Sequence, residues 1–344
     1  MNASGAILGS HAFPADGSQG LNPNPLIQAS DGNLYGTTML AGDPTANAGT
    51  AFRITTAGVQ ILHIFKSPDG VGPVGRLVEG NDGNLYGTTL GGGTSGDGTV
   101  FRMDKTGNLQ TIFSFDGTNG KNPVGDLVSD PGGNLYGVTV IGGSKGFGTV
   151  FKITLGGILT TIYSFQGGHA CPNPLARSAD GSLYGTTSDL SIAGPVSCRA
   201  ANIDTAFGSI FRISPQGKFS VLHSFAGDGV SPAFPSGAPL LASDGNLYGV
   251  SNIGGSGFLG QGTIFQFTPT GQLSWSSFLG GSDDASPCCE VLQSAGGSLI
   301  GITQGFLDIE FGNEDAVVFS TGQGLAQPAP SILTALPDRG KWEV

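Results

Sequence analysis

The stretch that decides the fold is Asn84-Leu85-Tyr86-Gly87-Thr88-Thr89, followed by Gly98-Thr99-Val100-Phe101 and then by an apolar run that ends in Ser114-Phe115. These three landmarks recur along the chain. The Leu-Tyr-Gly copies have their tyrosines at Tyr35, Tyr86, Tyr136, Tyr184 and Tyr248, and a degenerate sixth copy puts Ile300 in that position. Self-similarity at a period of about 50 residues indicates a repeat architecture, so we expect these tyrosines to be packing residues of the repeat.

Each repeat contains four short runs of β-branched and aromatic residues, separated by turn pairs such as Asp31-Gly32, Asp82-Gly83 and Gly107-Asn108. Runs and turns of this kind predict one four-stranded antiparallel sheet per repeat. Four strands in a repeat of about 40 to 50 residues are typical of a β-propeller. We therefore predict an all-β fold, a six-bladed β-propeller of four-stranded antiparallel blades. Residues 1–320 would form this single domain and residues 321–344 a C-terminal tail.

The last repeat has no evident fourth strand, because Gln327-Pro328-Ala329-Pro330 follows Phe319 and proline cannot donate to a β-ladder. The run from Ile7 to Phe13 ends on a phenylalanine, as the other outer strands do. We predict that this N-terminal strand completes the last blade and closes the ring. The alternative is that Ser331–Leu336 supplies the strand.

The order Asn-Leu-Tyr-Gly-Thr-Thr, Gly-Gly, Gly-Thr-Val-Phe and a Ser-Phe strand resembles the GloVer tandem repeat of bacterial choice-of-anchor proteins, over roughly residues 5–320. This resemblance implies an exported, propeller-like protein that is secreted or displayed at the cell surface, and it implies no assigned activity. The C-terminal sorting anchor that often follows such repeats is not evident after Phe319.

Composition narrows the classes of function. The 344 residues include 61 Gly and 21 Phe, and 38% are hydrophobic, which is enough for a core and excludes disorder over most of the chain. Only 11% are charged, and the net charge of −11 argues against a nucleic-acid partner. No apolar stretch approaches the roughly 18 to 20 residues of a membrane span.

The connections within a repeat are unequal. Turns such as Ser30-Asp31-Gly32-Asn33 are tight, whereas the connections between the second and third strands are long and variable, up to Ser188–Phe207. In a four-stranded meander these two kinds of connection lie on opposite faces. Loops on a rigid scaffold usually carry binding residues, so we expect recognition on the long-loop face.

Three charged residues stand ten positions before the anchor tyrosine or its equivalent: Arg76, Asp126 and Glu290. We expect them at the start of the innermost strands, where the central channel opens. Asp126 and Glu290 could then act as an acid and base pair, with Arg76 orienting an anion. The alternative is a solvated channel mouth with offsetting charges.

Further candidates lie in loops of the same face. His169 is the one histidine outside the repeated outer-strand position, and a histidine near a carboxylate suits acid–base chemistry. Asp283 and Asp284 lie close to Glu290 and could bind calcium, but no ordered Asp/Asn ligand spacing accompanies them. We therefore predict no metal site and no cofactor, with calcium at this pair as the alternative.

Four cysteines allow three pairings. Cys171 and Cys198 belong to one repeat and one face, and a disulfide between them would pin the longest loop to its own blade. We predict this pair, which favours an oxidising compartment. Cys288 and Cys289 would then be two adjacent thiols or, alternatively, a vicinal disulfide.

The sequence thus predicts an exported propeller that acts as a binding or scaffolding module through its long-loop face. Its acidic character fits a neutral or cationic partner, and we expect extracellular polysaccharide or a surface protein. One alternative is a carbohydrate-active enzyme, a glycoside hydrolase or lyase that uses the channel-mouth carboxylates. Another is a structural unit of a larger assembly.

Overall fold

The computed structural model describes residues 13–14, 16–42, 47–166, 171–188, 207–228, 231–254, 262–277, 285–294, 296–305, 307–308, 312–313, 317–323 and 331–335. Within these ranges the regular secondary structure is β, in six antiparallel sheets and one short hairpin. No helix in this part of the chain has the length and apolar character needed to cross a membrane.

The six sheets follow one another along the chain. The first contains β1 (Leu21–Pro23), β2 (Ile27–Gln28), β3 (Leu34–Leu40), β4 (Thr50–Thr55) and β5 (Gly58–Ile64). The second contains β6 (Val71–Glu79), β7 (Leu85–Gly91), β8 (Thr99–Met103) and β9 (Leu109–Ser114). The third contains β10 (Lys121–Ser129), β11 (Leu135–Ile141), β12 (Thr149–Ile153) and β13 (Leu159–Ser164).

The second half repeats this plan. The fourth sheet contains β14 (Ala176–Arg177), β15 (Leu183–Thr187), β16 (Ser209–Ile213) and β17 (Phe219–Ser224). The fifth contains β18 (Ala233–Leu241), β19 (Leu247–Ile253), β20 (Thr263–Phe267) and β21 (Leu273–Ser277). The sixth contains β22 (Ala285–Gln293), β23 (Ser298–Gly305), β26 (Val317–Gln323) and β27 (Ser331–Ala335). The hairpin of β24 (Leu307–Asp308) and β25 (Gly312–Asn313) lies between β23 and β26 in the chain.

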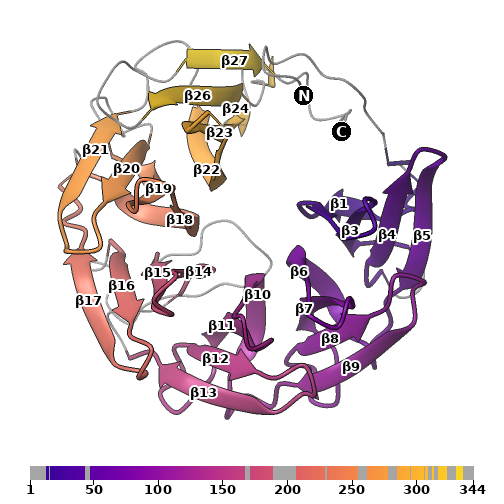
Figure 1. The fold of residues 1–344 in the computed structure, drawn as a ribbon. Coiled ribbons are helices and arrows are strands. Elements are labelled where there is room, and N and C mark those ends of the chain that lie inside the picture. The colour runs from indigo at the N-terminus through magenta and orange to yellow at the C-terminus, as the bar shows by residue number, and fades with distance from the viewer. Residues whose placement is uncertain are drawn as a thin grey trace.

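The sheets are arranged as the blades of a propeller (Figure 1). In each one the first strand lies towards the middle of the molecule and the last lies at its periphery, as β6 and β9 do in the second sheet. β1 and β2 both pair with β3, so together they act as one interrupted inner strand of the first sheet.

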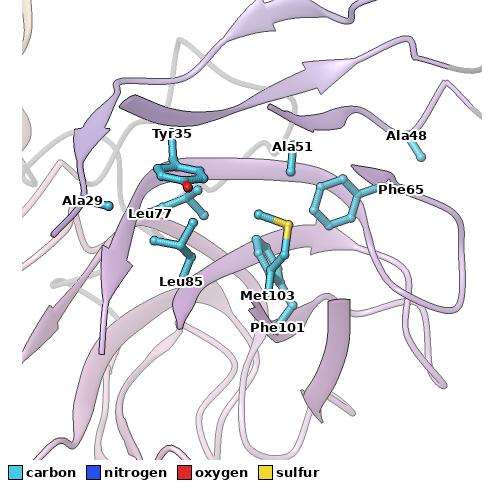
Figure 2. Packing of buried hydrophobic residues seen from close by; sticks show 9 residues of the cluster. All are labelled: Ala29, Tyr35, Ala48, Ala51, Phe65, Leu77, Leu85, Phe101 and Met103. Carbon is cyan, nitrogen blue, oxygen red and sulfur yellow. The ribbon is translucent and has the colours of Figure 1, made fainter. Parts of the chain in front are cut away.

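The hydrophobic core lies between neighbouring sheets. Figure 2 shows the layer between the first two sheets, where Tyr35 and Phe65 of the first meet Leu85 and Phe101 of the second. Equivalent layers join each later pair of neighbouring sheets up to the fifth and sixth. The anchor tyrosines at 35, 86, 184 and 248 are at most 3% exposed, which confirms that they are packing residues.

One aromatic contact repeats from sheet to sheet. The phenylalanine just after each of the first four outer strands packs against the phenylalanine of the third strand in the next sheet, as Phe65 does on Phe101 with ring centroids 5.2 Å apart. Phe13 makes the same edge-on contact with Phe52 of the first sheet, also at 5.2 Å. The chain therefore enters the first sheet in the way it enters the later ones.

The strand that completes the sixth sheet is not the predicted one. β27 pairs antiparallel with β26 and takes the fourth position, which the sequence analysis assigned to residues 7–13. Of those residues, Phe13 alone lies within the described ranges. Pro328 and Pro330 precede β27 instead of interrupting it, so Ser331–Ala335 keep the backbone donors that a strand needs. The sixth sheet thus extends beyond the predicted domain boundary at residue 320.

Candidate functional site

The turns between the first and second strands of the first, second, third and fifth sheets share one hydrogen-bonding pattern. An aspartate in the turn accepts hydrogen bonds from a following asparagine and from the hydroxyl of the anchor tyrosine, as Asp82 does from Asn84 and Tyr86. The tyrosine bonds are Tyr35–Asp31 at 2.7 Å, Tyr86–Asp82 at 2.8 Å, Tyr136–Asp130 at 2.9 Å and Tyr248–Asp244 at 2.7 Å. This role was not predicted, although the repeated aspartate before Asn-Leu-Tyr in the sequence is its signal.

We call this side of the molecule the tight-turn face. It comprises the turns between third and fourth strands and the turns within residues 29–33, 80–84, 130–134, 178–182 and 242–246. The hydrogen bonds in these turns set the charge states of their aspartates and tyrosines. Burial and the neighbouring aspartate raise the pKa of Tyr136 and of Tyr248 to about 12. Burial acts to raise the pKa of Asp31, but the bonds from Tyr35 and Asn33 outweigh it and hold that pKa at about 2. The turn aspartates are therefore ionised acceptors that close the turns.

A cross-sheet clasp holds the same face. The ammonium of Lys105, in the last turn of the second sheet, lies 2.6 Å from Glu79 and donates at 2.8 Å to the hydroxyl of Ser30 in the first sheet. Ser30 also donates its backbone N–H to Glu79 at 2.7 Å. The first two sheets are thus fixed to one another at this end.

The opposite side, the long-loop face, carries the connections between second and third strands and the crossings between sheets. Two of the connections between second and third strands are described in full, residues 92–98 and 142–148. Both are compact glycine-rich turns. A further 21 residues separate β15 from β16, residues 188–208, most of them outside the described ranges. On this face Lys121 pairs with Asp97 at 2.7 Å and His63 lies 3.1 Å from Asp69.

The structure brings together two of the predicted site residues. The backbone N–H of Arg76 donates to Asp126 Oδ1 at 2.5 Å, and the Arg76 Nε lies 3.5 Å from Asp126 Oδ2. The Arg76 side chain is 33% exposed and that of Asp126 is 18% exposed. Burial raises the pKa of Asp126, against the opposing effect of the N–H and the guanidinium of Arg76. The pair is a partly buried ionic contact between neighbouring inner strands.

The sequence predicted that these residues lie at the start of the innermost strands. The structure places them elsewhere. Arg76 and Asp126 stand inside β6 and β10, where the pairing register shifts between Val74 and Val78 and between Val124 and Val128. Such a bulge turns side chains away from the regular alternation of a strand. The bulge directs the two charged groups towards one another across the sheets.

In the first and fourth sheets the corresponding irregular stretch is one residue shorter. In the second sheet this stretch contains four residues, 74–77. In the first sheet it contains three, residues 24–26, and in the fourth sheet also three, residues 173–175. In the first sheet the side chain of Asn24 donates to Thr37 and to the carbonyl of Pro73 in the next sheet, each at 2.9 Å. Counting back from the tyrosine therefore does not give equivalent positions in all six sheets.

The bulged segments approach one another closely. A Cβ on Gly75 would lie 2.4 Å from the carbonyl oxygen of Gly125, and a Cβ on Gly125 would lie 1.9 Å from Pro174 Cγ. Cα atoms of β10 and β18 also come within 8 Å of each other, although the fourth sheet separates their sheets in the chain. The centre of the molecule is narrow beside the Arg76–Asp126 pair.

The remaining candidates cannot be placed with this pair. Glu290, Cys288 and Cys289 belong to β22, but their side chains lie outside the description, and His169, Cys198, Asp283 and Asp284 fall outside the described ranges. Cys171 is 2% exposed. Among the described residues, no three His, Cys, Asp or Glu side chains gather as a metal site would require.

Comparisons with known proteins fit this architecture. A family model described as the Gloeobacter/Verrucomicrobia repeat matches residues 2–197. No match was found among curated proteins.

Among solved structures, a virginiamycin B lyase from Staphylococcus aureus is similar at 16% identity and a TM-score of 0.59, covering 93% of this chain and 85% of that one. A gluconolactonase from Xanthomonas campestris is similar at 14% identity and a TM-score of 0.53, over 98% and 90% of the chains. The extracellular domain of a protein described as a one component system from B. thetaiotaomicron matches at 14% identity and a TM-score of 0.53, covering 94% of this chain and 38% of that one. At these identities the likeness shows the propeller fold alone.

Proposed function

Because the chain belongs to the Gloeobacter/Verrucomicrobia repeat family, we propose that it is an exported β-propeller that acts as a binding or scaffolding module through its long-loop face. Its partner is extracellular polysaccharide or another surface protein. The observation that carries the proposal is the contrast between the two faces. The turn aspartates of the tight-turn face are occupied by the chain's own asparagines and tyrosines, whereas the longest and most variable connections leave the other face.

Charge supports a neutral or cationic partner. Between Lys218 and Arg339 the sequence contains no Lys or Arg. The acids in that stretch are Asp228, Asp244, Asp283, Asp284, Glu290, Asp308, Glu310, Glu314, Asp315 and Asp338. The fifth and sixth sheets therefore belong to a part of the chain that carries only negative charge, which repels polyanions.

The proposal includes a closed ring of six blades. In the second and third sheets, Val78 and Val128 pack in the layer towards the following sheet. The register-equivalent residue of the sixth sheet, Leu292, is 53% exposed, and Leu21 of the first sheet is 36% exposed. Packing the sixth sheet against the first would cover both side chains, as the contact of Phe13 with Phe52 supports.

A loop replacement tests the binding role. Residues 189–206 are replaced by residues 141–146, the register-equivalent stretch of the third sheet. The variant and wild type are screened on a glycan array and in polysaccharide pull-downs. Loss of binding in a variant with an unchanged melting temperature supports recognition through the long loop. Retention of every wild-type ligand, or no ligand for the wild type, argues against the proposal.

One observation favours an enzyme as the second candidate. Asp126 is a partly buried carboxylate whose pKa is raised by burial, as general acids often are. With Glu290 it would form the acid and base pair of a glycoside hydrolase or lyase. Product analysis of every bound glycan, for wild type and for the Asp126→Asn and Glu290→Gln variants, decides between the two. Turnover that disappears in either variant supports the enzyme, and binding without products supports the module.

A further inference from the structure

A groove on the tight-turn face of the second sheet is not used by the proposed function. It has a volume of about 270 Å³ and is lined by Asn84, Arg102, Asp104, Asn108, Leu109 and Gln110. Its walls come from the turn before β7, the end of β8 and the turn into β9. The groove therefore combines a guanidinium, a carboxylate and three side-chain amides above one apolar side chain.

The turn that forms the groove is held from two sides. Lys105, which follows Asp104, is held by Glu79 and Ser30 at 2.6 and 2.8 Å. Gly107 packs so closely on the first sheet that a Cβ there would lie 2.4 Å from the Leu62 carbonyl oxygen. Because the turn is already ordered, a ligand that binds to it does not lose free energy to ordering the turn, and this favours affinity.

The polar groups are also fixed in direction. The Arg102 guanidinium donates to Gln110 Oε1 at 2.8 Å, and Asn108 donates to Asp104 Oδ2 at 2.7 Å. Hydrogen bonds from Thr106 and Asn108 hold the pKa of Asp104 far below its usual range. Asp104 is therefore ionised at any ordinary pH, and because Thr106 and Asn108 occupy its oxygens it contributes mainly a negative charge, opposite to that of Arg102.

This combination selects against charged ligands. An anion attracted by Arg102 meets the Asp104 carboxylate, and a cation attracted by Asp104 meets the guanidinium. A neutral ligand with adjacent hydroxyls has no such conflict, since each hydroxyl both donates and accepts a hydrogen bond. Asn108 already donates to Asp104 and Thr106. Gln110 already accepts from Arg102. The match to hydroxyls is therefore completed by the Asn108 carbonyl oxygen as acceptor and the Gln110 amide as donor.

We propose that this groove is a binding subsite for one neutral sugar unit of a saccharide, separate from the long-loop face. It deepens the proposed function if the partner there is polysaccharide, because the molecule would then hold a glycan at two faces. The subsite itself does not depend on that function.

The first sheet supplies a matched control. Arg53 is the register equivalent of Arg102 and donates to Gln60 at 2.6 Å, as Arg102 does to Gln110. The fifth sheet has Gln266 at this position, and its amide donates to the anchor tyrosine Tyr248 at 2.9 Å. An Arg→Gln change is therefore compatible with the sheet at either site.

The experiment titrates the whole chain with cellotriose, maltotriose and laminaritriose by calorimetry and by NMR, beside trigalacturonate and a glucosamine trimer as charged comparators. At least one neutral trisaccharide should bind with a dissociation constant on the order of millimolar. Arg102→Gln should weaken it about tenfold or more, and Gln110→Trp, which fills the groove from an exposed position, should abolish it. Arg53→Gln should bind as the wild type does.

Equal weakening by Arg102→Gln and Arg53→Gln would overturn the subsite, as would tighter binding of a charged comparator. So would the absence of binding by all three neutral probes at concentrations on the order of tens of millimolar. The loop replacement at residues 189–206 leaves the groove intact. If the loop replacement loses trisaccharide binding and Arg102→Gln keeps it, the result counts against the subsite and for the long-loop face. If Arg102→Gln loses binding and the loop replacement keeps it, the result supports the subsite.

Discussion

The hydroxyl of Tyr86 donates a 2.8 Å hydrogen bond to the Asp82 carboxylate, so the tyrosine that fills the layer between the second and third sheets also closes the turn at the end of its own sheet. The same bond recurs in the first, third and fifth sheets. A repeated sequence landmark thus joins core packing to turn geometry.

Removing the acceptor should cost more than removing the donor. Asp82→Ala leaves the Tyr86 hydroxyl and the Asn84 amide without their partner and should lower the free energy of unfolding by about 1–3 kcal/mol. Tyr86→Phe removes one hydroxyl and should cost only about 0.5–1.5 kcal/mol. Urea unfolding of both variants measures the difference. A larger loss for Tyr86→Phe would contradict this account of the turn.

Acid should weaken the turns. The folded-state pKa of Asp31 and of Asp180 is about 2, below the ordinary value of 3.8. The ionised carboxylates therefore stabilise the fold at a pH above the ordinary pKa of 3.8. That stability is lost as the pH falls through the folded-state pKa of about 2. An Asp31→Asn, Asp180→Asn variant should melt below the wild type near neutral pH, and the gap should close at about pH 2. A gap that is constant with pH would show that these carboxylates are not the cause.

One buried hydroxyl should be dispensable. Thr88 is 2% exposed, and its Oγ1 has no hydrogen-bond partner among the described residues. The equivalent residues of the third and fifth sheets are Val138 and Val250. Thr88→Val should therefore raise the free energy of unfolding, by up to about 1–3 kcal/mol.

The opposite sign is expected in the first sheet. Thr37 accepts a 2.9 Å bond from Asn24, so Thr37→Val should destabilise the protein. Denaturant midpoints of the two variants provide the comparison, and a loss of stability in both would refute the assignment of Thr88.

Close packing at the centre should make Gly125 irreplaceable. Gly125 and Gly83 both have positive φ, +64° and +75°, but a Cβ on Gly83 would meet nothing within 4 Å, whereas one on Gly125 would clash with Pro174. Gly83→Ala should cost about 1–2 kcal/mol for the backbone conformation alone, and Gly125→Ala clearly more. Similar melting temperatures for the two variants would mean that the centre can expand.

The cysteine pairing remains a prediction. Peptide mapping of the protein, purified from an oxidising compartment, under non-reducing conditions should give a fragment in which Cys171 is linked to Cys198. A link from Cys171 to Cys288 or Cys289 would exclude the predicted pair. A Cys288–Cys289 fragment would instead support the vicinal alternative.

The strands were predictable because their signals are local. Leu-Tyr-Gly and Gly-Thr-Val-Phe each lie within a single strand and its turn, so pattern alone places them in the second and third strands. Tyr86 could be assigned to the core in this way, but its bond to Asp82 could not, because alternation gives the face of a side chain and not its partner.

The centre of the molecule was harder to predict for the same reason. Arg76 and Asp126 stand out in the sequence, but a one-residue difference between inner strands is invisible until strand pairing fixes the register. The fourth strand of the sixth sheet likewise depended on which of two segments reaches β26.

The sequence by itself determined the repeat, the six antiparallel sheets and the unequal connections, since these follow from periodicity and turn chemistry within a few neighbouring residues. Only the tertiary structure decided that Arg76 meets Asp126, that Ser331–Ala335 completes the sixth sheet, and that Arg102 and Asp104 share a groove. These relationships join residues of different strands, and their free energies depend on how whole sheets align.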